Sequence, residues 1–268
     1  MTTSTDYYKQ GMLSEAISEL GRELSEKPND AVKRAFLAEL LCISGDLERA
    51  DAQLDVLVTL EPEKALTIGT WRQLIRAAKT RKEVFDNGRM PDVVDEPTDR
   101  IQGLLSTHLS LRESDDIAVS QQTIELENSR EACVATVNGE TVDDLRDLDD
   151  LCAGVLEVMA TNGLYYWVDF TQISTLEFEA PQRPLDLLWR KASIVLHKGT
   201  EGEVFIPSIY ATPTDDSDAL LGRKTDWLEE GGLVRGVGLR HLLAGDEMLP
   251  ILDIESVEFT SNSVAMTG

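Results

Sequence analysis

Two stretches near the N-terminus decide the fold: GMLSEAISELGRELSEKP at 11–28 and GDLERADAQLDVLVTLEP at 45–62. Five residues keep the same spacing in both, Gly11, Leu13, Ala16, Leu20 and Pro28 in the first and Gly45, Leu47, Ala50, Leu54 and Pro62 in the second. Three more positions repeat at the same offset of 34, Ala31, Leu40 and Leu41 matching Ala65, Leu74 and Ile75. A period of about 34 residues is typical of the tetratricopeptide helix–turn–helix repeat.

The chemistry of the repeated positions supports this interpretation. A small residue such as Ala16 lets two helices approach closely, Gly11 ends one helix and turns the chain, and Pro28 stops the next. The period fades after position 75, because Lys79 stands where a third glycine belongs. We therefore expect two degenerate repeats and a closing helix over 65–81, which need the rest of the chain for stability. An ordinary antiparallel helical bundle is the alternative.

After this region the pattern changes from helices to strands. A polar connector over 81–97 leads to helical patterns from 98 to 131. Asn138-Gly139 and Asn162-Gly163 each stand between short β-type runs and predict hairpins. Further short runs at 175–178, 193–197, 203–206 and 255–259 predict more strands.

The chain is accordingly predicted to be an α+β protein in three parts. Residues 1–97 form the tetratricopeptide-like helical region with its connector, and 98–131 a helical segment joining the halves. Residues 132–268 form a compact antiparallel β-rich domain.

Composition excludes several classes of function. The 268 residues include 25 Lys+Arg and 49 Asp+Glu, a net charge of −24, which disfavours nucleic acid and anionic membranes as partners. No window reaches the roughly 18 apolar residues of a membrane helix, and the N-terminus lacks the pattern of a signal peptide. Three distant cysteines without a CxxC motif predict reduced thiols and a cytoplasmic protein.

Motifs for catalysis, metals or cofactors are not recognisable. The three histidines share no metal-ligand spacing: His108, His197 and His241. The acidic run over 143–150 lacks the glycine and glutamate of a calcium loop and predicts a solvated or helix-capping segment. The glycines at 236 and 238 lack the third glycine of a dinucleotide motif. We expect no catalytic residue, no metal and no cofactor.

Aromatic residues and arginine suggest a binding surface in the β-rich half. Tyr165, Tyr166 and Arg190 are its candidates, since aromatic residues and arginine dominate binding energy at many interfaces. The alternative is that alternate aromatic residues fill the core, which is favoured for Trp167.

Eight motifs follow one another through the second half: LRDLDD (145–150), VLEV (155–158), NGLYYWVDF (162–170), LEF (176–178), RPLDLLWR (183–190), GEVF (202–205), GRKTDW (222–227) and GDE (245–247). Together they resemble the ImpE family, also called TagJ or SciE-type proteins, of bacterial type VI secretion. The resemblance implies a cytoplasmic, non-enzymatic adaptor that binds the N-terminal helix of the small contractile-sheath subunit. It also implies an indirect relation to the AAA+ unfoldase that recycles the sheath, and it supplies no catalytic residues.

A tetratricopeptide-like groove would hold such a partner helix. By analogy with these repeats, six residues are expected to line it: Val32, Phe36, Glu39, Ile43, Gln73 and Arg76. The alternative for Phe36 and Ile43 is a place in the core. The alternative function is an enzyme or small-ligand-binding protein with an unrecognised site in the β-rich domain.

Overall fold

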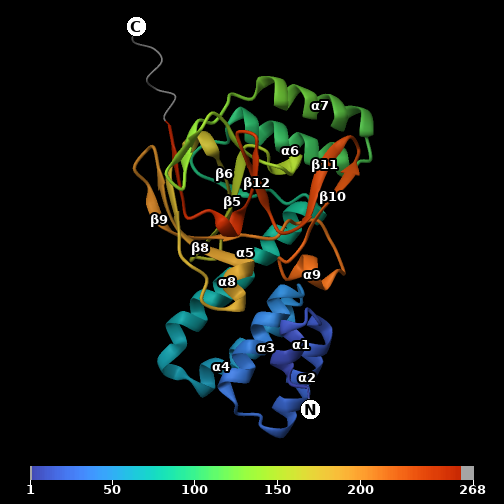
Figure 1. Cartoon of the computed structure of the whole chain (residues 1–268), viewed down its shortest axis with the longest axis vertical. Helices are drawn as coiled ribbons and strands as arrows, with labels where there is room; N and C mark the ends of the chain where they lie inside the picture. Colours follow the sequence, from blue (N-terminus) through green and yellow to red (C-terminus); the bar gives the residue numbers. More distant parts are fainter. Residues whose placement is uncertain (1, 261–268) are drawn as a thin grey trace.

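A computed structural model describes residues 2–260 and has the predicted α+β class, with helices first and a sheet after them (Figure 1). The helical end of the molecule contains α1 (Ser4–Lys9), α2 (Leu13–Glu26), α3 (Ala31–Ile43), α4 (Leu47–Leu60), η1 (Pro62–Lys64) and α5 (Ala65–Asn87). The long helix α5 leads from this end into the β-rich end, so it belongs to both (Figure 1).

Local signals set the helix boundaries. Asp30 and Asp46 cap α3 and α4 by accepting hydrogen bonds from backbone N–H groups of the first turn. Gly11 and Gly45 follow α1 and α3 with φ of +80° and +78°, a left-handed conformation that favours glycine. Ala16 of α2 is fully buried, as close helix packing requires.

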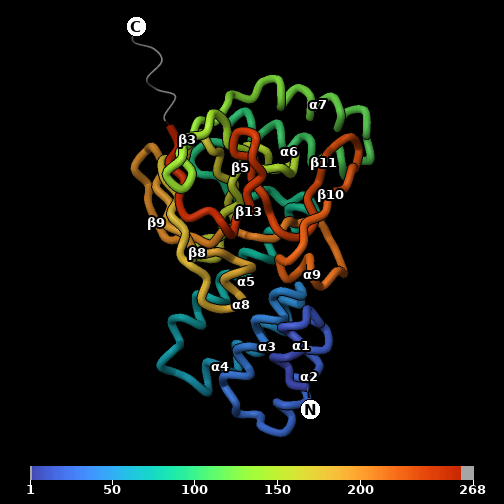
Figure 2. Tube along the Cα trace, in the orientation of Figure 1, coloured from blue at the N-terminus to red at the C-terminus, as the bar shows by residue number. Residues whose placement is uncertain are grey.

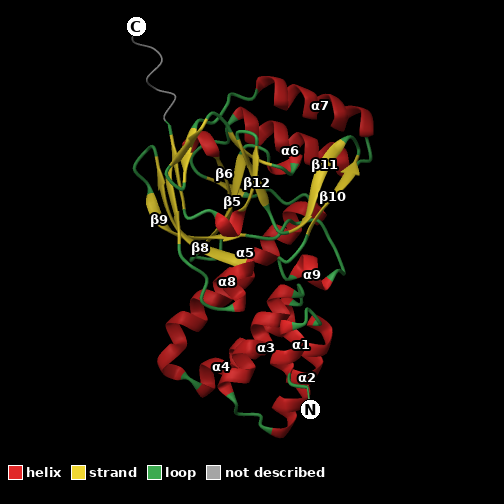
Figure 3. Cartoon of the chain, viewed as in Figure 1, coloured by secondary structure: helices red, strands yellow, loops and turns green. Residues whose placement is uncertain are grey.

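Helices α6 (Asp99–Arg112) and α7 (Asp116–Ser129) form a hairpin over the end of the sheet farthest from α1–α4 (Figure 3). Between α5 and α6, where the sequence predicted only a connector, lies the short strand β1 (Asp92–Val93). It pairs with β6 in parallel.

The main sheet has nine strands in the order β1-β6-β5-β9-β8-β7-β14-β2-β3. Their bounds are β2 (Ala135–Val137), β3 (Glu140–Val142), β5 (Val155–Ala160), β6 (Tyr165–Asp169), β7 (Ile173–Phe178), β8 (Trp189–Leu196), β9 (Glu201–Pro207) and β14 (Ser256–Phe259). All neighbours are antiparallel except β1 and β6, so the sheet as a whole is mixed. The strands within the predicted β-rich region, 132–268, pair antiparallel as expected, and the parallel strand β1 comes from the predicted connector.

Two smaller sheets complete the β-rich end. One contains β13 (Glu247–Pro250), β12 (His241–Ala244) and β4 (Leu145–Asp147), and the other pairs β10 (Thr225–Glu230) with β11 (Leu233–Gly238). Short helical turns connect the strands: η2 (Asp150–Cys152), η3 (Phe170–Gln172), α8 (Pro184–Leu188), α9 (Ser217–Leu220) and η4 (Ile251–Asp253). The chain trace brings α8 and α9 down beside the first helices (Figure 2).

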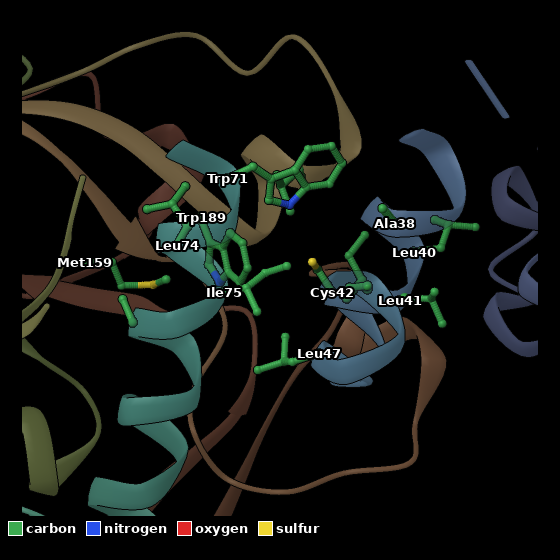
Figure 4. Packing of buried hydrophobic residues seen from close by; sticks show 14 of the residues in the cluster. Ala38, Leu40, Leu41, Cys42, Leu47, Trp71, Leu74, Ile75, Met159 and Trp189 are labelled. Atoms are coloured by element: carbon green, nitrogen blue, oxygen red, sulfur yellow. The ribbon is translucent and has the colours of Figure 1, made fainter. Parts of the chain in front are cut away.

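The two faces of the main sheet contribute to different cores. Because neighbouring strand residues point to opposite faces, Met159 of β5 joins the core shared with the helices and Val158 joins the core on the other face. The shared core includes Trp71, Leu74 and Ile75 of α5, together with Trp189 at the start of β8 (Figure 4). This core therefore attaches the helical end to the sheet.

No helix within residues 2–260 combines the length and the apolar character needed to span a membrane.

Candidate functional site

The six residues predicted to line a groove lie in different environments. At the start of α3, Val32 is 79% exposed, and Phe36 is half-buried with its ring edge-on to Tyr8 at a centroid distance of 5.6 Å. Farther along α3, Glu39 and Ile43 are buried. Of the four predicted residues on α3, the two at its beginning are therefore the accessible apolar ones.

The middle of the predicted groove is filled by the chain's own segment 183–188. The Arg183 Nη1 atom lies 3.4 Å from Glu39 Oε1, and its guanidinium carbon lies 4.9 Å from the centre of the Trp71 ring. Arg183 thus bridges α3 and α5, and α8 follows it with Leu185 buried in the shared core. Burial raises the pKa of Glu39 to about 7, although Arg183 acts in the opposite direction.

Gln73 and Arg76 lie where α5 meets the turn between β5 and β6. A Cβ atom on Gly163 of that turn would lie 2.5 Å from Gln73 Oε1 and 3.3 Å from Arg76 Cδ. Gly163 also has φ of +88°, so glycine is required there for two reasons. Gln73 and Arg76 therefore help to seat the helical end on the sheet, and they also line a shallow polar hollow beside α4.

The second surface expected from Tyr165, Tyr166 and Arg190 does not form. Tyr165 is fully buried, and its hydroxyl donates to Glu157 and accepts from the Trp167 indole. Arg190 is 3% exposed and donates to the Ile251 and Ile254 carbonyls. Only Tyr166 is half-buried. The alternation of strand side chains explains this outcome, because Tyr165 and Tyr166 point to opposite faces of the sheet.

A buried ion network lies under the junction of α5 and the sheet. Glu157 of β5 has a side chain that is 1% exposed. Its Oε1 atom lies 2.6 Å from Nε of Arg81 on α5, and it forms a second ion pair with Arg240. Arg81 also donates to the Ile209 carbonyl at 2.9 Å. Burial alone would raise the pKa of Glu157, but the two guanidinium groups hold it well below its usual range. Glu157 is therefore an ionised anchor whose hydrogen-bonding positions are taken.

The acidic run extends this network, which corrects its prediction as a solvated segment. Asp147 is fully buried, accepts a hydrogen bond from the Tyr210 hydroxyl at 3.1 Å and lies 3.5 Å from Arg240. Burial raises the pKa of Asp147 to about 7. Asp149 is also buried and pairs with Arg235. The capping part of the prediction holds, since Asp149 accepts from the first turn of η2.

A cleft of about 270 Å³ opens above this network, between the α3–α4 turn, α5 and residues 209–214. Arg81 and Tyr210 of the network line it, together with apolar side chains such as Phe85 and Trp189. Burial keeps two groups near the cleft, His108 and Cys42, in their neutral forms at pH 7. Burial lowers the pKa of His108 to about 3, and burial raises the pKa of the Cys42 thiol to about 12.

The geometry of the cleft therefore provides apolar contacts and hydrogen bonds for binding. Among residues 2–260, no group of three or more His, Cys, Asp or Glu side chains is placed to hold a metal ion. The fold and the site together define the class of the protein: an array of short helices seated on a mixed sheet through a buried ion network.

Comparison with known proteins places the chain more closely. The family model for ImpE protein matches residues 139–258, within the β-rich end of the chain. It is 28% identical over 253 residues to the type VI secretion system accessory component TagJ of Pseudomonas aeruginosa, covering 94% of this chain and 89% of TagJ. The resemblance found in the sequence motifs is thereby confirmed.

The fold is also similar to a solved structure. The crystal structure of the Vibrio parahaemolyticus protein VPA1032 matches with a TM-score of 0.89 and 31% sequence identity. The match covers 96% of this chain and 97% of that chain. The arrangement of helices and sheet described above is therefore shared by that protein over nearly its whole length.

Proposed function

We propose that this protein is a cytoplasmic, non-enzymatic adaptor of a type VI secretion system that binds the N-terminal helix of the small sheath subunit. The observation that carries the proposal is the similarity to TagJ, an accessory component of that system, over 94% of the chain. In this proposal the adaptor changes sheath assembly or recycling, and it affects the AAA+ unfoldase only through the sheath.

The helical end supports a helix-binding role. Helices α2 and α4 begin at Leu13 and Leu47 and end at Glu26 and Leu60, so both boundaries differ by 34 residues. This is the spacing of tetratricopeptide-like repeats, whose grooves bind helices through a few apolar anchors. We assign the degenerate repeats to this class.

We place the partner helix at the accessible end of the predicted groove. Val32 projects from the start of α3, Phe36 follows one helical turn along, and the Phe36 ring contacts Tyr8 of α1. Glu39 lies deeper, in contact with Arg183, and Ile43 is buried at the end of α3, so we treat both as support. Gln73 and Arg76 form a polar rim on α5.

Calorimetric titration tests this proposal with a peptide spanning the N-terminal helix of the small sheath subunit from the same organism. We expect micromolar or tighter binding, about −8 kcal/mol, and no binding of a scrambled peptide of equal charge. Val32→Glu should weaken binding at least tenfold, because a carboxylate would enter the apolar contact. Val32 is so exposed that its substitution leaves the core intact.

Leu66→Glu is the matched control, since Leu66 is a 90% exposed apolar residue on α5, outside the proposed contact. It should bind as the unmodified protein does. Absence of binding by the unmodified protein would refute the sheath partner. Normal binding by Val32→Glu would refute the location and leave the partner standing.

A further inference from the structure

A second pocket lies on the sheet face that the helices do not cover. Its volume is about 480 Å³, and its walls come from β1, β5, β6, β8 and β9. Its floor is apolar, made of buried side chains from four of these strands: Val158, Val168, Ile194 and Val204. We call it the β5–β9 pocket. Concave sites lined mainly by apolar side chains, with a few polar groups, are common binding sites.

Part of one wall of the β5–β9 pocket is a strand edge, residues 201–203 of β9, that pairs on one side with no strand among residues 2–260. β9 pairs with β8 from Glu201 to Pro207, but on its other side it pairs with β5 only at Val204 and Phe205. β5 ends at Ala160 and turns away into the loop that contacts α5. Residues 201–203 of β9 therefore leave one side of their backbone open next to the pocket. Such an edge is a template for one more strand.

The residue in the middle of this edge leaves space. Gly202 is paired with Ile194, so it belongs to the face that forms the pocket floor. A Cβ atom on Gly202 would meet nothing within 4 Å. The half-buried Tyr166 also lines the pocket, and its hydroxyl makes no hydrogen bond to another described residue. The pocket thus combines an apolar floor, an open backbone edge and one available hydroxyl.

Two acidic residues beside this edge of β9 indicate which side chains an added strand would carry on its other face. Glu201 and Glu203 flank Gly202 and point to the opposite face, because side chains alternate along a strand. Both carboxylates are exposed; Glu203 is paired with Lys191 at 2.8 Å, and Glu201 has no ion pair to a described residue. A strand added here would place one face on the apolar floor and the other beside these carboxylates.

We propose that the β5–β9 pocket binds an extended, basic peptide segment of a partner protein by adding it as a strand along β9. The segment alternates apolar and basic residues: apolar side chains enter the pocket over Gly202, and Lys or Arg side chains lie near Glu201 and Glu203. This site is on the sheet face away from α5 and does not depend on helix binding at α3.

A labelled peptide of strictly alternating sequence, acetyl-Lys-Val-Lys-Val-Lys-Val-Lys-amide, tests the proposal by fluorescence anisotropy with the full chain. We expect a dissociation constant below about 100 µM at low salt. Amide resonances of Gly202 and its β9 neighbours should shift on binding. Gly202→Val fills the pocket and should weaken binding at least tenfold, and the open space at Gly202 predicts an intact fold.

The controls separate strand addition from general attraction to an acidic protein. The control variant is Ser193→Val. Ser193 is exposed on the neighbouring strand β8, on the sheet face opposite the pocket, so this variant should bind the peptide normally. A peptide of the same composition with its valines in one block should bind at least tenfold more weakly, and one with Glu in place of Lys should not bind. Equal binding of the block or acidic peptide, normal binding by Gly202→Val, or no binding up to about 1 mM would each overturn the proposal.

Discussion

Neutralising Glu157 should strongly destabilise the protein. In Glu157→Gln the amide still fits and its oxygen still accepts hydrogen bonds, but its NH2 group meets donors in place of an acceptor, and the negative charge between Arg81 and Arg240 is lost. Arg81 and Arg240 are then left with one carboxylate close to them, Asp147, which lies 3.5 Å from Arg240. Removing one partner of a buried ion pair lowers the free energy of unfolding by more than the pair contributes, because the other charge stays buried without compensation.

The magnitude follows from burial. Breaking a buried pair costs roughly 3–5 kcal/mol, and we expect the lower end, because Asp147 lies near Arg240 and Ile209 retains its bond to Arg81. At about 2–4 °C per kcal/mol for a chain of this size, a loss of about 3 kcal/mol lowers the melting temperature by about 6–12 °C. Calorimetry or circular dichroism at pH 7 measures this change.

Two comparisons make the test specific. Glu83→Gln also breaks a pair on α5, with Arg89, but both side chains are about half exposed, so we expect no resolvable change. The double variant Arg81→Met/Glu157→Gln removes both charges of one pair. Its loss of unfolding free energy should therefore be smaller than the sum of the losses in the two single variants. A melting temperature of Glu157→Gln within about 2 °C of the unmodified protein would refute the argument.

Two other substitutions test the remaining features. The folded pKa of Glu39 is about 7 against 4.5 unfolded, so its contribution favours folding below about pH 4.5 and is lost as pH rises toward 7. The melting temperature of Glu39→Gln should therefore fall less between pH 5 and 8 than that of the unmodified protein. Parallel curves of melting temperature against pH for the two proteins would contradict the raised pKa of Glu39. Gly236→Ala should destabilise the protein by roughly 1–3 kcal/mol, because its Cβ would lie 2.1 Å from the Tyr210 ring, whereas Gly202→Ala should be neutral or stabilising in denaturant titrations.

Local signals in the sequence predicted much of the fold. The glycine and proline positions of 11–28 and 45–62 fall at the boundaries of α2 and α4, since these residues restrict the backbone wherever they occur. Asn138-Gly139 and Asn162-Gly163 stand at the turns of the β2–β3 and β5–β6 hairpins. Such signals act over a few residues and need no knowledge of the tertiary structure.

The buried charges could not be predicted in this way. Arg81 and Glu157 are 76 positions apart, and a charged residue in isolation is usually exposed. The one available signal was alternation, because Leu145, Asp147 and Asp149 occupy successive inward positions. Strands β10–β13 were also missed, since glycines and charges interrupt their apolar pattern.

The helical end shares its core with the sheet, and the sheet, α8 and Arg183 cover sides of α3 and α5. In the proposed repeat assignment, these are the sides that longer arrays leave open to partners. The same contacts that stabilise the helices thus restrict the proposed groove to the beginning of α3. A partner helix that reached farther would have to displace segment 183–188 and expose Leu185. Binding at the free end avoids that cost, which is why Val32 is the decisive position for the proposed adaptor.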